Sequence, residues 1–397
     1  MRWSTLSAAP HRLFFIGGLT MMILSMAAWM AARAGLLAVP LSGLDHAFLI
    51  SHGVLAFFIF GFLITVFPRW LDQAAIGRRW YLAAFLGLAS GIAGLMIGLA
   101  IAPRLVPWAL AVAGAGWLAG WLALARVFWR AQKTVVHTLV VLPALLLGLG
   151  ALLAYALWRA GGDWIWVYVG VTASLWLFLA PIFLAVCHRM IPFFSHAALG
   201  GHYQMVRPAV LLWLLVAGCW THFGLSALHR FEWLWLADLP LAAIAGYLWL
   251  RWGPDRSRGN ALLRALFVAY AWFWIAALIA AAQSLWYLFD GNFVFGRAPV
   301  HALTIGFFSS MAMAMVTRVA LGHSGRKLVM ARWQWWALMS LQGVALIRIA
   351  AEWPGLAPDV ANNLIQTSGW LWLITLTPWA GYFIRVCATP RIDGKDG

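Results

Sequence analysis

The sequence consists largely of apolar runs that are each about twenty residues long, and these runs decide what the chain can fold into. A helix rises about 1.5 Å per residue, so one run spans the hydrocarbon core of a bilayer. Hydrophobic residues make up 64% of the chain and charged residues only 10%. Continuous apolar runs satisfy their backbone in lipid as helices. We therefore predict an all-α, polytopic membrane protein.

About twelve transmembrane helices are expected, joined by short links into a single transmembrane domain over residues 1–397. The apolar run after Arg12 is too long for the hydrophobic part of a signal peptide, so it is expected to be an uncleaved anchor. The link at 102–106 is the shortest and 189–205 the longest. The expected spans lie near residues 12–34, 45–67, 80–102, 105–128, 135–158, 164–188, 206–227, 233–252, 261–288, 298–319, 332–350 and 361–386.

The basic residues predict the orientation of these helices. With the N-terminus in the cytoplasm, most of the 27 Lys and Arg residues fall in cytoplasmic links, and most of the 11 acidic residues fall outside. Both termini are therefore expected to be cytoplasmic. The formal net charge of +16 reflects this topology and gives no reason to expect nucleic-acid binding.

Histidine is costly in hydrocarbon and usually faces a bundle interior or a cofactor. The predicted outer side carries His46, His52, His222, His229 and His301, and the other six of the 11 histidines lie on the inner side. His301 and His323 open and close the same span. They are about 33 Å apart along a helix, so they cannot serve one site.

The second and tenth helices both descend from the outer side and both begin with His-Ala, in "HAFLISHG" and "HALTIGFF". Two such imidazoles suit the axial positions of a haem, so His301 is expected to share an iron with His46 or His52. The tenth helix also carries a stripe of small residues at Ala302, Gly306, Ser310 and Ala314. That stripe fits a porphyrin face and fits helix packing equally well.

On the inner side, "AVCHRMIPFFSHAALGGHYQ" follows Pro181, which should kink its helix. His188, His196 and His202, with Cys187, suit a copper or zinc site, although the spacing matches no standard metal motif and a solvated loop explains it as well. Arg189, Arg318 and Arg326 suit lipid phosphates or haem propionates. No CxxCH motif is present, so a haem would be held without covalent attachment, as haem b.

Four stretches resemble the NnrS family of bacterial inner-membrane proteins: "PHRLFFIGG", "HAFLISHG" with "GFLITVFPRW", "RMIPFFSHAAL", and the opening of the tenth helix with its tail "RVALGHSGR". The resemblance implies a haem- and copper-containing protein tied to nitric oxide metabolism, nitrosative stress and denitrification. The matching residues are His301, Arg189, Pro192, Arg318, Gly322, His323, Gly325 and Arg326. His323 from this resemblance, and His188 from the inner-side cluster beside Cys187, join His46, His52 and His301 as candidate metal ligands.

The chain departs from the family pattern at the second helix, where a His-x-His-Glu run is expected. His46 takes the first place, Phe48 and Leu49 take the others, and His52 lies one turn further along. This departure weakens the expectation of copper more than that of haem. A fainter likeness to haem–copper oxidases and nitric oxide reductases fails at their copper centre, because the sixth and seventh helices offer only His188 and His222, at opposite ends.

We therefore expect a haem-binding protein of the bacterial inner membrane that handles nitric oxide or another small diatomic, by sensing, sequestration or protection, with electron transfer to an unknown redox partner as a further option. Two other classes stay open. One is a twelve-helix permease for a metal or small solute. The other is a redox enzyme that reduces nitric oxide.

Overall fold

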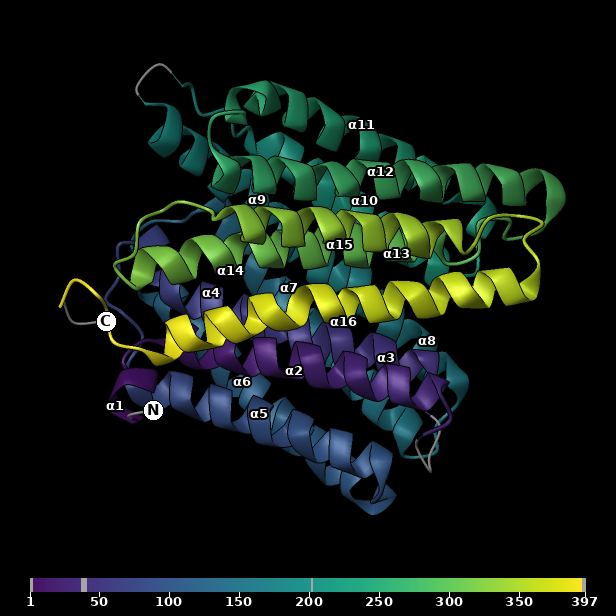
Figure 1. Cartoon of the computed structure of the whole chain (residues 1–397), viewed down its shortest axis with the longest axis horizontal. Coiled ribbons are helices and arrows are strands. Elements are labelled where there is room, and N and C mark those ends of the chain that lie inside the picture. The colour runs from purple at the N-terminus through teal and green to yellow at the C-terminus, as the bar shows by residue number, and fades with distance from the viewer. Residues whose placement is uncertain (1–2, 37–40, 201–202, 395–397) are drawn as a thin grey trace. The chain divides into compact units, whose positions relative to one another are not determined.

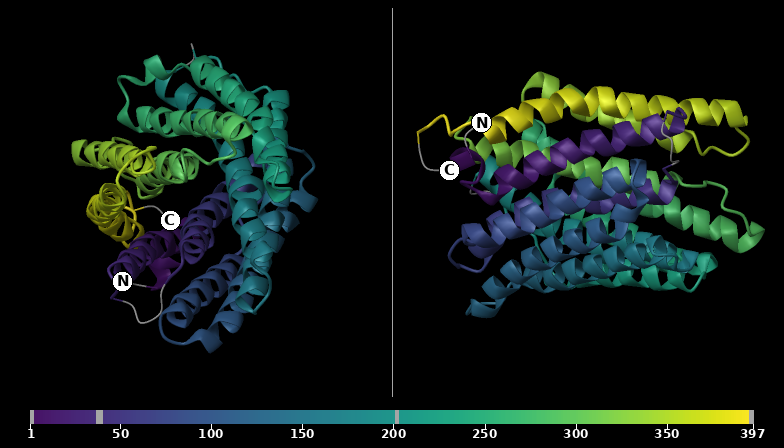
Figure 2. Two further views of the ribbon diagram at one scale, coloured as in Figure 1. Left: turned by 90° about the vertical axis from the view of Figure 1, so that its right-hand side faces the viewer. Right: turned by 90° about the horizontal axis from the view of Figure 1, so that it is seen from below.

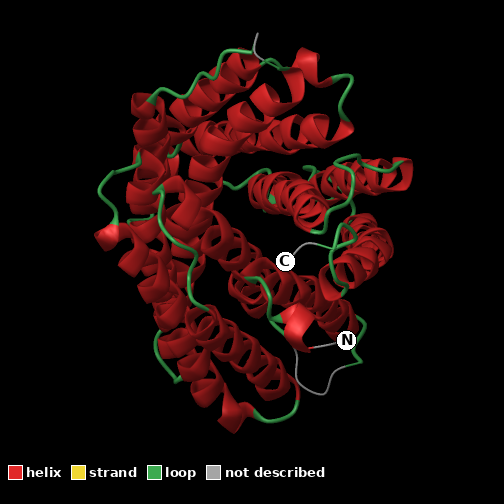
Figure 3. Ribbon diagram, turned by 90° about the vertical axis from the view of Figure 1, so that its left-hand side faces the viewer, coloured by secondary structure: helices red, strands yellow, loops and turns green. Residues whose placement is uncertain are grey.

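The computed structural model describes residues 3–36, 41–200 and 203–394, and all regular structure in these residues is helical (Figure 3). Within the expected single domain, the chain forms two compact units. Unit 1 comprises residues 1–179, 319–327 and 380–397, and unit 2 comprises residues 180–318 and 328–379. The helices within each unit run alongside one another for much of their length (Figures 1 and 2).

Unit 1 is built mainly from the first half of the chain. Its elements are α1 (Trp3–Leu6), α2 (Pro10–Arg33), α3 (Gly43–Phe48), η1 (Leu49–Leu55), α4 (Ala56–Trp70), α5 (Arg78–Ala100), η2 (Pro103–Leu105), α6 (Val106–Arg130), α7 (Val136–Arg159), α8 (Trp164–Ala173) and η3 (Ser174–Leu179), with the last turns of α14 and α16.

Unit 2 follows from Ala180. Its elements are α9 (Ala180–Leu199), α10 (Ala209–Ala227), η4 (Phe231–Trp233), α11 (Trp235–Trp252), η5 (Pro254–Ser257), α12 (Ala261–Asp290), α13 (Ala298–His301), η6 (Ala302–Ser309), α14 (Ser310–His323), α15 (Arg332–Ala350) and α16 (Pro358–Ala388), without the last turns of α14 and α16.

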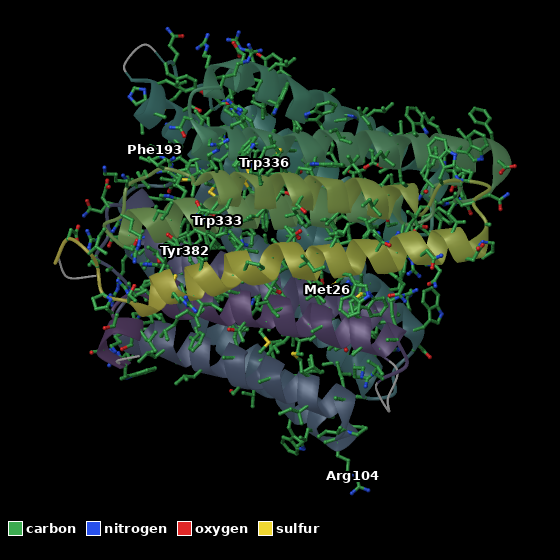
Figure 4. The ribbon with its side chains drawn as sticks, viewed as in Figure 1. Met26, Arg104, Phe193, Trp333, Trp336 and Tyr382 are labelled. Carbon is green, nitrogen blue, oxygen red and sulfur yellow. The ribbon has the colours of Figure 1, made fainter. Side chains whose placement is uncertain are left out.

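Local sequence explains where several helices begin and end. Ser42 accepts a hydrogen bond from the Asp45 amide while the Asp45 carboxylate accepts one from the Ser42 amide, a reciprocal cap that starts α3. Asn260 caps α12 through its side-chain oxygen. Gly253 and Gly291 end α11 and α12 in the left-handed conformation. The short link between the third and fourth spans is the single turn η2, and Arg104 projects from it (Figure 4).

Among the described residues, eleven helices are long and apolar enough to cross a membrane, judged by length and composition. The remaining expected span, 332–350, forms α15, whose 19 residues are long enough but include Gln334, Gln342 and two arginines, and it does not meet the same criterion. Many exposed tryptophans lie at helix ends, for example Trp333 near the start of α15 (Figure 4), as expected for side chains at the membrane interface.

One predicted link was wrong. Residues 189–199, expected to leave the membrane as a loop, continue α9 as helix, and they bury Met190, Ile191 and Phe194 inside unit 2. The apolar side chains there follow the helix period, so burial favours helix over loop. In unit 1, Arg12 at the start of α2 bonds the Cys387 carbonyl at the end of α16. The start of α2 and the end of α16 therefore lie side by side at one end of unit 1 (Figure 1).

Candidate functional site

Three of the expected spans change from α-helix to π-helix partway along their length. These are the segments η1, η3 and η6. They lie in the spans that carry His46 and His52, His188 and Arg189, and His301 and Arg318, the residues singled out from the sequence. A π segment widens the helix and leaves a backbone carbonyl unmatched, and such segments are frequent at functional sites. The segment η3 ends two residues before Pro181, which lacks the amide that an α-helix would need there.

His52 lies in η1 at the centre of unit 1 and is fully buried. Its Nε2 donates to the Gly148 carbonyl on α7 at 3.0 Å, and its Nδ1 lies 2.9 Å from the Ser51 hydroxyl. The Phe48 ring stacks on the imidazole at 4.5 Å, and Trp117 and Phe178 flank it. Both ring nitrogens therefore have protein partners, and this imidazole does not fit the role of an iron ligand.

His46 lies in α3, near the predicted outer end of unit 1. Its ring stacks on the Trp29 indole of α2, with centroids 4.7 Å apart. Next to it, the buried Asp45 accepts a hydrogen bond of 2.5 Å from the Tyr155 hydroxyl on α7, and Arg159 lies 3.6 Å away. Because carboxylates are costly to bury without partners, this network fixes the start of the second span and with it the position of His46.

His301 is the last residue of α13, in unit 2, and η6 follows it directly. Its Nδ1 lies 2.9 Å from the Arg297 carbonyl, one turn back along the helix. A carbonyl only accepts hydrogen bonds, so Nδ1 carries the proton and Nε2 carries the lone pair of the neutral ring. Metal-binding histidines are commonly oriented in this way, by a backbone oxygen that binds the other ring nitrogen.

The small-residue stripe after His301 packs against protein. The Trp272 indole of α12 lies so close to Gly306 that a methyl group there would come within 2.5 Å of it. The Trp272 indole also donates to Gln342 on α15, and Gln342 in turn donates to Ser310. Helix packing therefore explains this part of the stripe, and an indole occupies the surface that a porphyrin face would need.

A second oriented imidazole in unit 2 was missed by the sequence reasoning. His222 on α10 donates from Nδ1 to the Asp238 carboxylate on α11 at 2.7 Å, and the Asp238 side chain is fully buried. The carboxylate fixes the ring so that Nε2 carries the lone pair. The signal lay in the sequence, because a carboxylate and a histidine inside consecutive short-linked spans are expected to pair.

The inner-side histidines of α9 are held by the loop that follows the helix. The His188 side chain hydrogen-bonds the Pro208 backbone, and His196 Nδ1 lies 3.1 Å from the Tyr203 carbonyl. Tyr203 itself donates to the Trp252 carbonyl, and burial raises the pKa of its phenol. His202 lies outside the described residues. Among the described residues, no three His, Cys, Asp or Glu side chains gather as a metal site.

The two candidate arginines in unit 2 differ in their surroundings. The Arg318 guanidinium stacks over the Phe194 ring of α9 at 4.0 Å and is 9% exposed. This cation–π contact explains how a charge is tolerated near the end of a span. Arg189 is partly buried, and the positive charge of Arg207 acts on it.

His323, the last residue of α14, lies in unit 1 beside a histidine that the sequence did not single out as a ligand. Its ring centroid is 4.5 Å from that of His11, and the planes are tilted by 43°. Arg12 and Arg69 act electrostatically on both rings. Two imidazoles among guanidinium groups make a poor site for a metal cation, so the residues present do not fit copper here.

The structure thus places the His323 ring against the His11 ring and hydrogen-bonds His222 to Asp238. His46 and His52 belong to unit 1 and His301 to unit 2, so the pairing of His301 with one of them stays a prediction. In the described part of the chain, eleven helices long and apolar enough to cross a membrane define a polytopic, all-helical membrane protein.

The chain belongs to the NnrS family. The family model described as NnrS protein matches residues 5–391, nearly the whole chain. No curated protein matches it. This membership fits a nitric oxide-related membrane protein and agrees with the resemblance found in the sequence.

Proposed function

We propose that this protein binds haem b within the membrane and handles nitric oxide through it, by sensing, sequestration or protection. The observation that carries the proposal is the orientation of two imidazoles of unit 2. In both His301 and His222, Nδ1 donates to an oxygen atom and Nε2 carries the lone pair. Family membership supports the link to nitric oxide.

In this proposal His301 would hold the haem iron together with His46 or His222. His52 is left out because Gly148 and Ser51 engage both its nitrogens. When bound, haem would supply an iron atom that binds a small diatomic molecule in exchange for one of these imidazoles. The chain itself contributes the orientation of each imidazole, because the Arg297 carbonyl and the Asp238 carboxylate hold the rings.

Optical spectra of the detergent-purified full chain, reconstituted with hemin, test the proposal. We expect a Soret band that is lost or shifted in His301→Ala and that shifts when nitric oxide is added to the reduced wild type. Of His46→Ala and His222→Ala, the variant that also changes the band identifies the second ligand. His229→Asn is the matched control, because His229 lies in a loop at φ +55°, a conformation that asparagine tolerates.

Two results would overturn the haem assignment: a wild-type protein without a Soret band after reconstitution, or a band that His301→Ala leaves unchanged. A Soret band that does not respond to nitric oxide would instead overturn the proposed ligand and leave the haem in place.

A further inference from the structure

A group of basic side chains gathers where helix ends meet in unit 1, separate from the oriented imidazoles described above. We call it the basic end cluster. Its members come from α2, α4, the last residue of α14 and the segments that follow α14 and α16: His11, Arg12, Arg69, His323, Arg326 and Arg391.

The segment after α16 folds back to form one wall of this cluster. The Ile392 amide donates to the Ser324 carbonyl, which ties the segment to the turn after α14. Arg391 makes two hydrogen bonds, of 2.9 and 2.6 Å, to the Asp393 carboxylate. Arg391 is therefore neutralised by its own neighbour, whereas the other members are not.

Several polar atoms of the cluster are buried without a hydrogen-bond partner among the described residues. They are Nδ1 of His11, Nε of Arg12 and Nη1 of Arg326. Arg12 Nη1 is satisfied by the Cys387 and Thr389 carbonyls at the end of α16, at 3.0 and 2.6 Å. A buried polar atom that lacks a partner costs free energy, so these atoms indicate that something supplies one.

The charge balance indicates what that partner is. Among the described residues, no carboxylate forms an ion pair with Arg12, Arg69 or Arg326. Guanidinium groups repel a metal cation and bind phosphate oxygens through two parallel N–H donors. His11 adds a further buried ring nitrogen, and its exposed fraction is only 3%. The missing partner is therefore an anion.

The position of the cluster narrows the choice of anion. His11 is near the first residue of the span Pro10–Arg33, His323 ends the span Ala298–His323, and Cys387 is near the end of Pro358–Ala388. All three mark the depth at which a membrane helix reaches the lipid headgroups, where phosphate is the abundant anion.

We propose that the basic end cluster binds a phosphate group, carried either by an anionic lipid headgroup or by free phosphate. Arg12 and Arg326 donate to the phosphate oxygens, and His11 and His323 line the site. Binding holds the start of α2 and the turn after α14 around one anion through Arg12 and Arg326, and the end of α16 is linked to them because its Cys387 and Thr389 carbonyls accept from Arg12.

Retention of lipid by the full-length protein tests this proposal. The chain is reconstituted into nanodiscs of phosphatidylcholine with phosphatidylglycerol, released into detergent, and weighed by native mass spectrometry. We expect bound phosphatidylglycerol on the wild type and about tenfold less on Arg326→Gln, since the variant loses a charge-assisted hydrogen bond. Arg79→Gln is the control, because Arg79 is an exposed arginine of the same unit, in the first turn of α5, and should change nothing.

A second arm separates the two sources of phosphate. In nanodiscs of phosphatidylcholine alone, inorganic phosphate is titrated and the melting temperature is followed. A rise for the wild type that is absent in Arg326→Gln identifies free phosphate as the ligand. Where Arg326→Gln fails to fold, Arg326→Lys replaces it, because lysine keeps the charge and lacks the paired donors. The proposal is overturned if neither phosphatidylglycerol nor phosphate distinguishes the wild type from the Arg326 variant, or if Arg79→Gln loses as much lipid.

Discussion

The imidazole rings of His11 and His323, which lie far apart in the sequence, are in contact with centroids 4.5 Å apart. The sequence marked His323 as a candidate metal ligand but gave His11 no role. Their contact shows that the end of α14 packs against the start of α2 within unit 1. The turn that follows His323 and contains Gly325 is therefore constrained by this packing.

Gly325 in that turn should not tolerate a side chain. Its φ is +73°, and a methyl group there would lie 2.7 Å from the Asp393 carboxyl carbon. We expect Gly325→Ala to lower the free energy of unfolding by about 1–3 kcal/mol and to weaken the contact between the 389–393 segment and Ser324. Gly355→Ala is the control, since Gly355 has φ +80° and open space around it. Equal losses in thermal unfolding would show that backbone strain alone is responsible.

Two glycines of α7 should respond differently to the same substitution. A methyl group on Gly148 would lie 2.7 Å from the Trp117 ring and 2.9 Å from that of Phe178, whereas one on Gly150 would meet nothing within 4 Å. We expect Gly148→Ala to destabilise the protein by about 1–3 kcal/mol, because it overpacks the contacts around His52. Gly150→Ala should be neutral or slightly stabilising. Melting curves that do not separate the two variants would contradict this account.

His52 is expected to matter for stability and not for haem. His52→Ala removes a fully buried ring with hydrogen bonds to Gly148 and Ser51, so unfolding should become easier by about 2–5 kcal/mol. The Soret band of folded protein should keep its position. A folded His52→Ala protein that has lost the band would return His52 to the list of iron ligands.

The His222–Asp238 pair should be worth far more than an exposed pair nearby. Asp238→Asn removes the charge from a side chain that is fully buried, and we expect a loss of about 2–4 kcal/mol. Glu232→Gln breaks the contact of 3.5 Å with Arg230, whose side chain is 65% exposed, and should cost about 0–1 kcal/mol. Chemical unfolding of both variants checks the difference. Similar losses would mean that water reaches Asp238.

The sequence by itself determined the helices, the approximate spans and the family. Run length, apolar content and the need to satisfy the backbone in lipid are local properties, so each span could be read without its neighbours. The distribution of basic residues also predicted that His11, Arg12 and Arg326 lie on the same side of the membrane. The structure brings these three residues together at one end of unit 1.

The tertiary structure alone decided which groups each imidazole contacts. The change to π-helix in three of the described spans and the engagement of both nitrogens of His52 have no local signature strong enough to predict them. The physical reason is that the deciding partner, Gly148 on α7 for His52 and Asp238 on α11 for His222, lies on another helix. Its identity depends on helix rotation and depth, which packing sets once the whole unit is assembled.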